Sequence, residues 1–392
     1  MTRRTVYKGA RRCVLVAVVG RTPAIITETL WVLEQLQKVH VDEIRVITTS
    51  EGQRAITDEL LGDDGQFQCY CREYAVPSGR LAFSTKSIHL LLDARCRPLD
   101  DIRSSEDNNA AADQIYSLIK QWTQRPEEIL LCSAAGGRKT LGIYLSMALM
   151  LCGRADDRLM HILVAPEFET GVRGFYYPPA KERSFRCFTG VDESGRPLYR
   201  NVSSADAALE LADIPYPKLR EIIGGELPLE LGLTAAIAHS QRILGYLQAP
   251  PKLLMQLDRG VVQVGVFQFS LSRQLMAVYA FMLLQVSGVG RSKNIDELFA
   301  ARLALARLER TMDCLRQGEQ ESYAWERMKD VDDFRARIGP CISKLNRAIT
   351  QALGNNRLAE LYRISTGRAY GIQTADFQID ESKDRPWLHE WQ

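Results

Sequence analysis

The segment Cys13-Val-Leu-Val-Ala-Val-Val19, which continues into Gly20-Arg-Thr-Pro23, contains the clearest structural signal in the chain. Seven consecutive apolar and largely β-branched residues are typical of a strand buried on both faces of a parallel sheet. Thr22 is a suitable helix cap and Pro23 a suitable first helical residue, so we expect a helix from here to about Val39. The segment therefore predicts a strand, a tight turn and a helix.

The same pattern recurs through the first half of the chain. Further strands are expected at Glu43–Thr48, Glu128–Ser133 and His161–Val164. The first two lead into expected helices over Glu51–Leu61 and Leu141–Cys152. This alternation predicts an open, doubly wound, Rossmann-like parallel sheet of the α/β class.

Three intervening segments are less regular. Asn108–Thr123 has apolar residues at helical spacing and predicts an amphipathic helix. Phe67–Val76 suggests short strands, and Phe175–Arg200 has the turn residues of a hairpin, which we expect as an antiparallel addition to the sheet edge.

The alternation stops where Ile214-Pro-Tyr-Pro217 and Gly224-Gly225 punctuate the chain, so we place a domain boundary between about 200 and 225. The expected domains are residues 1–205 and 225–392. In the second domain we expect an edge strand at 261–269, helices at 270–286, 294–317 and 330–353, and a hairpin-like stretch over 357–379. Helices followed by a hairpin predict a mainly helical domain similar to a winged helix-turn-helix.

Composition excludes several classes of protein. The 392 residues include 50 basic and 48 acidic side chains, so no global field attracts nucleic acid or membrane. The nine cysteines include no C-x-x-C pair, and the five histidines form no cluster, which argues against a disulfide framework, a zinc site or any other metal. The apolar run at 13–19 is far shorter than the roughly 20 residues of a membrane span. We expect a cytoplasmic protein without a cofactor.

Three loops follow expected strands and should meet at one edge of the sheet: Gly20-Arg21-Thr22, Thr48–Glu51 and Ser133–Thr140. In the last loop, Gly136-Gly137 lets backbone N–H groups approach an anion, and Arg138-Lys139 supplies positive charge. A phosphate group is the expected guest. The alternative is a tight turn followed by two solvated cations. Neither G-x-x-x-x-G-K-[ST] nor G-x-G-x-x-G is present, which disfavours an ordinary NTPase or dinucleotide enzyme.

Four segments together carry a family resemblance: Val18–Leu30, Val46–Gly52, Asp101–Asn108 and Ser133–Thr140. In these segments the chain resembles the CRISPR-associated Rossmann-fold (CARF) proteins, in the branch of type III CRISPR ring nucleases and ring-nuclease-like effectors. The resemblance covers about residues 12 to 200, and the C-terminal half carries much less of it.

The resemblance implies a homodimer that shares one cyclic oligoadenylate, expected to be cyclic tetra-adenylate, across its two-fold axis. It also implies metal-independent ring opening, in which a ribose 2′-hydroxyl attacks the adjacent phosphate. The catalytic candidates are Lys139, Arg138 and Thr22. The ligand-binding candidates are Gly20, Arg21, Thr27, Thr49, Ser50, Glu51, Ser133, Gly136, Gly137 and Thr140. For Thr27 the alternative is a hydroxyl satisfied within the first helix.

The resemblance leaves the final activity open between an enzyme that degrades the messenger and a messenger-gated regulator that acts through the C-terminal domain. An RNA-cleaving HEPN effector is disfavoured, because the only R-x(4-6)-H spacing runs from Arg154 to His161, inside the Rossmann-like region. Basic residues of the C-terminal domain could contact DNA or RNA, although nearby acidic residues make a solvated face an equal alternative. These basic residues are Arg335, Arg337, Lys344, Arg347, Arg357, Arg363 and Arg368.

Overall fold

A computed structural model describes residues 11–62, 64–223, 232–315, 325–374 and 376–380. The chain divides into two compact units. Unit 1 contains residues 1–221 and 228–237, and unit 2 contains residues 222–227 and 238–392. Each unit has its own hydrophobic core.

Unit 1 is built on a six-stranded sheet with the strand order β3-β2-β1-β4-β5-β8. Its strands are β1 (Arg12–Val18), β2 (Glu43–Thr48), β3 (Ile88–Leu90), β4 (Glu128–Ser133), β5 (Arg158–Val164) and β8 (Leu209–Asp213). The first five are parallel, and β8 pairs antiparallel with β5. The predicted Rossmann-like parallel sheet is confirmed.

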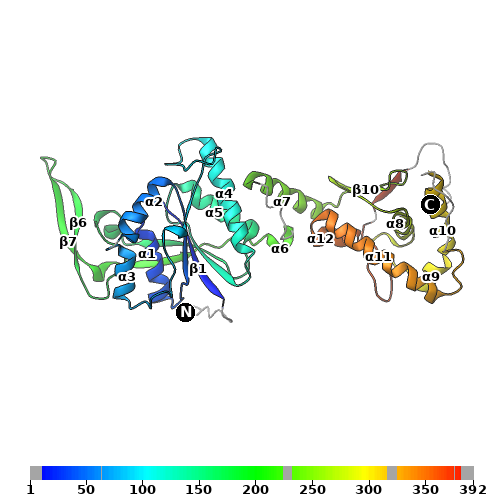
Figure 1. The fold of residues 1–392 in the computed structure, drawn as a ribbon, viewed down its shortest axis with the longest axis horizontal. Helices are drawn as coiled ribbons and strands as arrows, with labels where there is room; N and C mark the ends of the chain where they lie inside the picture. Colours follow the sequence, from blue (N-terminus) through cyan, green and yellow to red (C-terminus); the bar gives the residue numbers. More distant parts are fainter. Residues whose placement is uncertain (1–10, 63, 224–231, 316–324, 375, 381–392) are drawn as a thin grey trace. The chain divides into compact units, whose positions relative to one another are not determined.

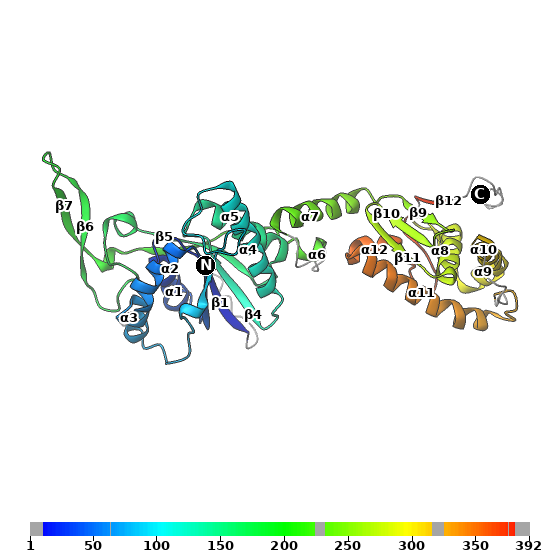
Figure 2. The ribbon, with the colours of Figure 1, turned by 45° about the horizontal axis from the view of Figure 1, so that its top comes forward.

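Helices lie on both faces of this sheet. These are α1 (Ala24–Trp31), α2 (Ser50–Ile56), α3 (Gln66–Glu73), α4 (Ser105–Thr123) and α5 (Lys139–Cys152). Figures 1 and 2 both place α1, α2 and α3 on one side of the strands and α4 and α5 on the other. Leu15 of β1 and Leu131 of β4 pack with Leu30 and Tyr70 in one core. Strands covered on both faces need the continuous apolar sequence that β1 and β4 have.

The structure corrects two local predictions in unit 1. Phe67–Val76 does not form strands, because Phe67 and Tyr70 are buried on the same face of α3 at helical spacing. Thr22 does not cap the first helix, since the N-cap position of α1 belongs to Pro23. Two helices also continue as π-helical turns, Val32–Leu36 after α1 and Thr57–Leu61 after α2.

The expected hairpin forms between β6 (Ser184–Val191) and β7 (Pro197–Ser203), but it is a separate two-stranded sheet and not an edge of the main sheet. Figure 1 shows it extending beyond the helices of unit 1. The edge belongs to β8, whose Leu209 and Leu211 side chains are buried in the unit 1 core.

A buried ion triad joins two strands on either side of β1. Arg45 of β2 is 4% exposed, and its guanidinium donates to the Glu128 carboxylate of β4 over 2.7 and 2.8 Å. It also donates to Glu43 over 2.7 Å. Glu43 and Glu128 are the first residues of their strands, so the triad lies at the amino ends of β2 and β4.

Unit 2 is mainly helical, as predicted. Its helices are α8 (Arg273–Val286), α9 (Ile295–Ala300), α10 (Arg302–Leu315), α11 (Val331–Leu353) and α12 (Asn356–Tyr362). A four-stranded sheet has the order β11-β10-β9-β12, formed by β9 (Leu253–Gln256), β10 (Val261–Val264), β11 (Phe267–Ser270) and β12 (Phe377–Asp380). The division between the units falls near α6 (Arg220–Ile223) and within α7 (Leu233–Gln248). The winged-helix character stays a prediction.

Three boundaries in unit 2 differ from the predictions. The strand expected at 261–269 is a hairpin, because Gly265 turns the chain with a φ of +56°. The helix expected at 294–317 ends at Ala300 and restarts at Arg302. The hairpin expected at 357–379 is confined to a bridge between Ser365 and Gly371, since the residues before it form α12. Within the part of the chain that the structure describes, no helix is long and apolar enough to span a membrane.

Candidate functional site

Two glycine loops meet at the carboxyl edge of the sheet in unit 1. The strands β1 and β4 are paired in register, with Ala17 opposite Ser133, so the loops that follow them leave the sheet side by side. A Cβ atom on Gly20 would lie 2.9 Å from the Cα of Gly137, closer than side chains tolerate. Gly137 has a φ of +75°, a conformation that glycine adopts without strain. Glycine is therefore required for this contact between the loops.

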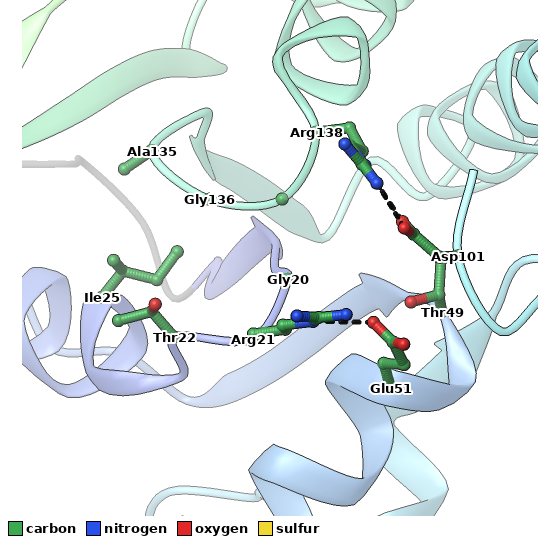
Figure 3. A pocket seen from close by; sticks show the side chains of 11 residues that line it. Gly20, Arg21, Thr22, Ile25, Thr49, Glu51, Asp101, Ala135, Gly136 and Arg138 are labelled. Atoms are coloured by element: carbon green, nitrogen blue, oxygen red, sulfur yellow. Dashed lines mark hydrogen bonds and ion pairs between the residues drawn. The ribbon is translucent and has the colours of Figure 1, made fainter. Parts of the chain in front are cut away.

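These loops and the start of α2 enclose a pocket of about 430 Å³, which we call the arginine pocket (Figure 3). It is lined by Gly20, Arg21, Thr22, Ile25, Thr49, Glu51, Asp101, Ala135, Gly136, Gly137 and Arg138. The segments come from four separate parts of the sequence. They converge because parallel strands end at one edge of a sheet.

Two ion pairs cross the arginine pocket, and Figure 3 shows both. The Nε atom of Arg21 donates to Glu51 Oε2 over 2.8 Å, and the Nε atom of Arg138 donates to Asp101 Oδ1 over 3.0 Å. A third guanidinium, that of Arg103, lies 3.5 Å from Asp101 and 3.7 Å from Glu51. Three guanidinium groups and two carboxylates give this network a formal charge of +1.

The carboxylates of this network stay ionised across the physiological range. The hydrogen bond from Arg138 lowers the pKa of Asp101 to about 2. The hydrogen bond from Arg21 likewise lowers the pKa of Glu51. An incoming anion would therefore compete with fixed negative charges for the same guanidinium groups, since neither carboxylate is removed by protonation near pH 7.

A second pocket of about 610 Å³, which we call the lysine pocket, shares Arg138 with the first. It is lined by Ile102, Arg103, Ser104, Ser105, Asn108, Arg138, Lys139 and Thr140. Lys139 is the first residue of α5 and its side chain is exposed. Ser104 and Asp107 form a capping box at the start of α4, which fixes the opposite wall.

The structure brings most of the candidate residues to these two pockets. Gly20, Arg21, Thr22, Thr49, Glu51, Gly136, Gly137 and Arg138 line the arginine pocket, and Lys139 and Thr140 line the lysine pocket with Arg138. Thr27, Ser50 and Ser133 line neither. Thr27 is fully buried, and its hydroxyl donates to the carbonyl oxygen of Tyr176 over 2.7 Å. The alternative considered for Thr27, a satisfied hydroxyl, matches this geometry.

Sequence reasoning missed Asp101 and Arg103 as site residues. Both lie in the segment Asp101–Asn108, which contributes to the family resemblance, and that was the available signal. Asp101 contacts Arg138, which lies 37 residues further along the chain, and a contact at this separation is not visible in the sequence. Among the residues that the structure describes, no group of three histidine, cysteine, aspartate or glutamate side chains is arranged to hold a metal ion.

The fold and this site define a Rossmann-like protein with an arginine-lined pocket at the carboxyl edge of its sheet. The family described as CRISPR-associated protein NE0113 (Cas_NE0113) matches residues 22–245, which is more than half of the chain. The chain belongs to this family, and the resemblance to CRISPR-associated proteins is confirmed. The match covers most of unit 1 and ends within α7.

Among solved structures, the chain is similar to Enterococcus italicus Csm6 bound to cyclic hexa-2′-fluoro-hexa-dAMP. The identity is 10%, the TM-score is 0.30, and the alignment covers 90% of this chain and 82% of that one. A similarity this low supports no argument about function. No curated protein matches the chain.

Proposed function

We propose that this chain binds a cyclic oligoadenylate, specifically cyclic tetra-adenylate, in the arginine pocket and opens the ring without a metal ion. The observation that carries the proposal is the convergence of the Gly20 and Gly136-Gly137 loops with Arg21 and Arg138 at one sheet edge. Backbone amides beside glycines and planar guanidinium groups are the groups that proteins use to hold phosphates. Membership of a CRISPR-associated family supports this assignment.

The size of the arginine pocket favours a ligand shared by two copies of the chain. A pocket of about 430 Å³ is in the range that encloses one drug-sized molecule. A ring of four nucleotides is much larger, so one copy would hold only part of it. A two-fold homodimer would place two identical pockets around a ligand of matching symmetry.

Ring opening requires that a ribose 2′-oxygen attack the adjacent phosphorus while the bond from phosphorus to the 5′-oxygen breaks. The proton of the 2′-hydroxyl leaves as the new bond forms, and the departing 5′-oxygen takes up a proton. The products are a 2′,3′-cyclic phosphate and a 5′-hydroxyl. Arg138 and Lys139 would stabilise the negative charge that develops on the phosphorane, and the Thr22 hydroxyl would orient the attacking or departing oxygen.

Arg138 has a further role in this scheme because it lines both pockets. Its guanidinium is held by Asp101, so the donors are already oriented before a phosphate arrives. A phosphate in either pocket would lie within reach of the same side chain. Lys139 lines only the lysine pocket, so it would contact a different phosphate oxygen from Arg21.

The direct test is incubation of the protein with cyclic tetra-adenylate in EDTA, followed by chromatography of the products. We expect linear adenylate ending in a 2′,3′-cyclic phosphate. Calorimetry should give one ring per two chains. Binding of one mononucleotide per chain in place of the ring would contradict the proposed ligand, and an intact ring after binding would contradict the proposed cleavage.

A second candidate is a messenger-gated regulator that binds the ring without cleaving it. Unit 2 favours this candidate, because it has its own core and lies largely beyond the family match. Such a unit could transmit ring binding to another partner. Binding to duplex DNA that requires the ring, in a sample where chromatography shows that the ring stays intact, would support the regulator over the nuclease.

A further inference from the structure

Unit 2 contains a separate pocket of about 530 Å³, lined by both polar and apolar residues, that the proposed ring chemistry does not use. It is lined by Gly288, Val289, Gly290, Arg291, Ser292, Glu360, Arg363, Ile364, Ser365, Gly371, Ile372 and Gln373. We call it the unit 2 pocket. Its walls come from the loop between α8 and α9, from the end of α12 and from the segment that follows α12.

Backbone hydrogen bonds fix the frame of this pocket. The Gly288 amide donates to the Ile372 carbonyl over 2.9 Å, and the Ser365 amide donates to the Gly371 carbonyl over 2.8 Å. Lys293 and Tyr370 exchange two backbone hydrogen bonds of 3.1 and 2.8 Å. The two loops therefore form a connected structure, so the groups that they carry have fixed positions before any ligand binds.

The glycine-rich loop Gly288-Val-Gly-Arg-Ser292 exposes backbone donors in this frame. Gly288 and Gly290 have φ values of +110° and +79°, a backbone region that favours glycine. The amides of Val289, Gly290 and Ser292 have no acceptor among the described residues of the chain. Concave loops of this kind with unpaired amides are common anion sites.

Two arginines line the same pocket. Arg291 comes from the glycine-rich loop, and Arg363 follows α12. Neither forms an ion pair with a carboxylate within the ranges that the structure describes. This contrasts with the arginine pocket of unit 1, where Arg21 and Arg138 are both paired.

The charge balance of the unit 2 pocket indicates the type of phosphate. Arg291, Arg363 and the Glu360 carboxylate leave a formal charge of +1. A phosphodiester carries one negative charge, which the net charge of +1 matches, and a phosphate monoester carries nearly two. The Glu360 carboxylate, the Gln373 amide and the two serine hydroxyls can also hydrogen-bond a base edge or a ribose hydroxyl.

We infer that the unit 2 pocket binds the phosphodiester backbone of single-stranded RNA. A strand whose bases are unstacked can place one nucleotide in a concave pocket of this size, which a duplex cannot do. Arg291 and Arg363 bind the phosphate from two sides, and the exposed amides of the glycine-rich loop complete the contact. This inference does not depend on ring binding in unit 1.

The test is hydrogen exchange of the full chain with a single-stranded RNA dodecamer, the same RNA as a duplex, and inorganic phosphate. We expect the single strand to protect the peptides covering 288–293 and 363–373. Exchange at 20–30 and 133–145 reports the arginine pocket separately, so failure of the two proposals can be distinguished. Protection by the duplex or by phosphate alone, without protection by the single strand, would overturn the inference.

The matched variants are the double substitution Arg291→Gln with Arg363→Gln and the control Arg242→Gln. Arg242 lies on the unit 2 part of α7 and is exposed, but it does not line the pocket. The double variant should bind the labelled single strand at least tenfold more weakly. The slope of log K against log salt should fall by about 1.4, because each lost phosphate contact on a single strand contributes about 0.7. An equal loss of RNA affinity in the control variant would show nonspecific electrostatic attraction and refute RNA binding in the unit 2 pocket.

Discussion

Replacing Gly20 with alanine tests the contact on which the arginine pocket is built. The new Cβ would lie 2.9 Å from the Gly137 Cα and 3.3 Å from the Gly137 nitrogen, and both are backbone atoms that cannot rotate away. Ordinary contact begins at 3.4 Å, so the two loops would separate by about half an ångström. Overpacking of this kind costs about 1–3 kcal/mol. The free energy of unfolding of unit 1 should fall by this amount.

The assay is hydrogen exchange in increasing urea, with peptides from β1 and α8 reporting the two units separately. Gly245→Ala is the matched control, because Gly245 lies inside α7 and nothing lies within 4 Å of its added Cβ. Helix propensity predicts that this control stabilises the chain by roughly 0.8–1.0 kcal/mol. If Gly20→Ala leaves the unfolding free energy of unit 1 unchanged, the rigid contact between the loops is refuted.

The remaining predictions concern charged residues of unit 1. Lys139→Ala should slow ring opening by a factor of ten or more at saturating ligand, since about 1.4 kcal/mol of lost transition-state stabilisation is already tenfold. Lys86→Ala, an exposed control outside both pockets, should open the ring at the parent rate, and equal single-turnover rates for both variants would end the catalytic assignment. Arg138 lowers the pKa of Asp101 to about 2, so the ionised Asp101 stabilises the parent above about pH 4, and this stabilisation is lost as the pH falls toward 2. Asp101→Asn should remove this contribution to the free energy of unfolding. Urea titrations at several pH values that show a constant difference between Asp101→Asn and the parent would contradict this. Burial and the nearby Glu169 raise the pKa of Glu28 to about 8. The free energy of unfolding of the parent should therefore fall by up to about 1.4 kcal/mol per pH unit as the pH rises from about 4.5 to 8. Glu28→Gln should flatten this pH dependence in the same urea titrations.

Local signals in the sequence were sufficient for the core of unit 1. The predicted strands Glu43–Thr48 and Glu128–Ser133 match β2 and β4 residue for residue, because buried parallel strands are rich in apolar side chains. Arg45, the charged residue inside β2, is buried in ion pairs with Glu43 and Glu128. The same reasoning failed for Phe67–Val76, where only two side chains are buried and helical spacing was the decisive pattern. In unit 2, apolar and polar residues alternate on both sides of Gly265, so one strand was predicted at 261–269 where the turn at Gly265 separates two.

The candidate site was less predictable than the sheet. Loops that follow parallel strands converge by topology, so Gly20, Thr49 and Gly137 could be grouped before their geometry was known. Asp101 could not be grouped in this way, because it follows no strand of the predicted set and reaches the site through Arg138. Thr22 and Thr27 illustrate the same limit. Thr27 lies in α1 and is buried, whereas Thr22 precedes α1 and lines the arginine pocket.

The ion triad of Arg45, Glu43 and Glu128 has a consequence for how this protein can evolve. The triad links β2 to β4 across β1 at the amino ends of these strands. The glycine loops lie at the opposite, carboxyl edge of the sheet. Strand register is thereby secured at a distance from the pocket. Loop residues at the carboxyl edge, apart from the contacting Gly20 and Gly137, can therefore be exchanged with little effect on strand pairing. For the ring ligand proposed above, a preference for a larger or smaller ring would thus depend on the loops alone, while the sheet that presents them stays the same.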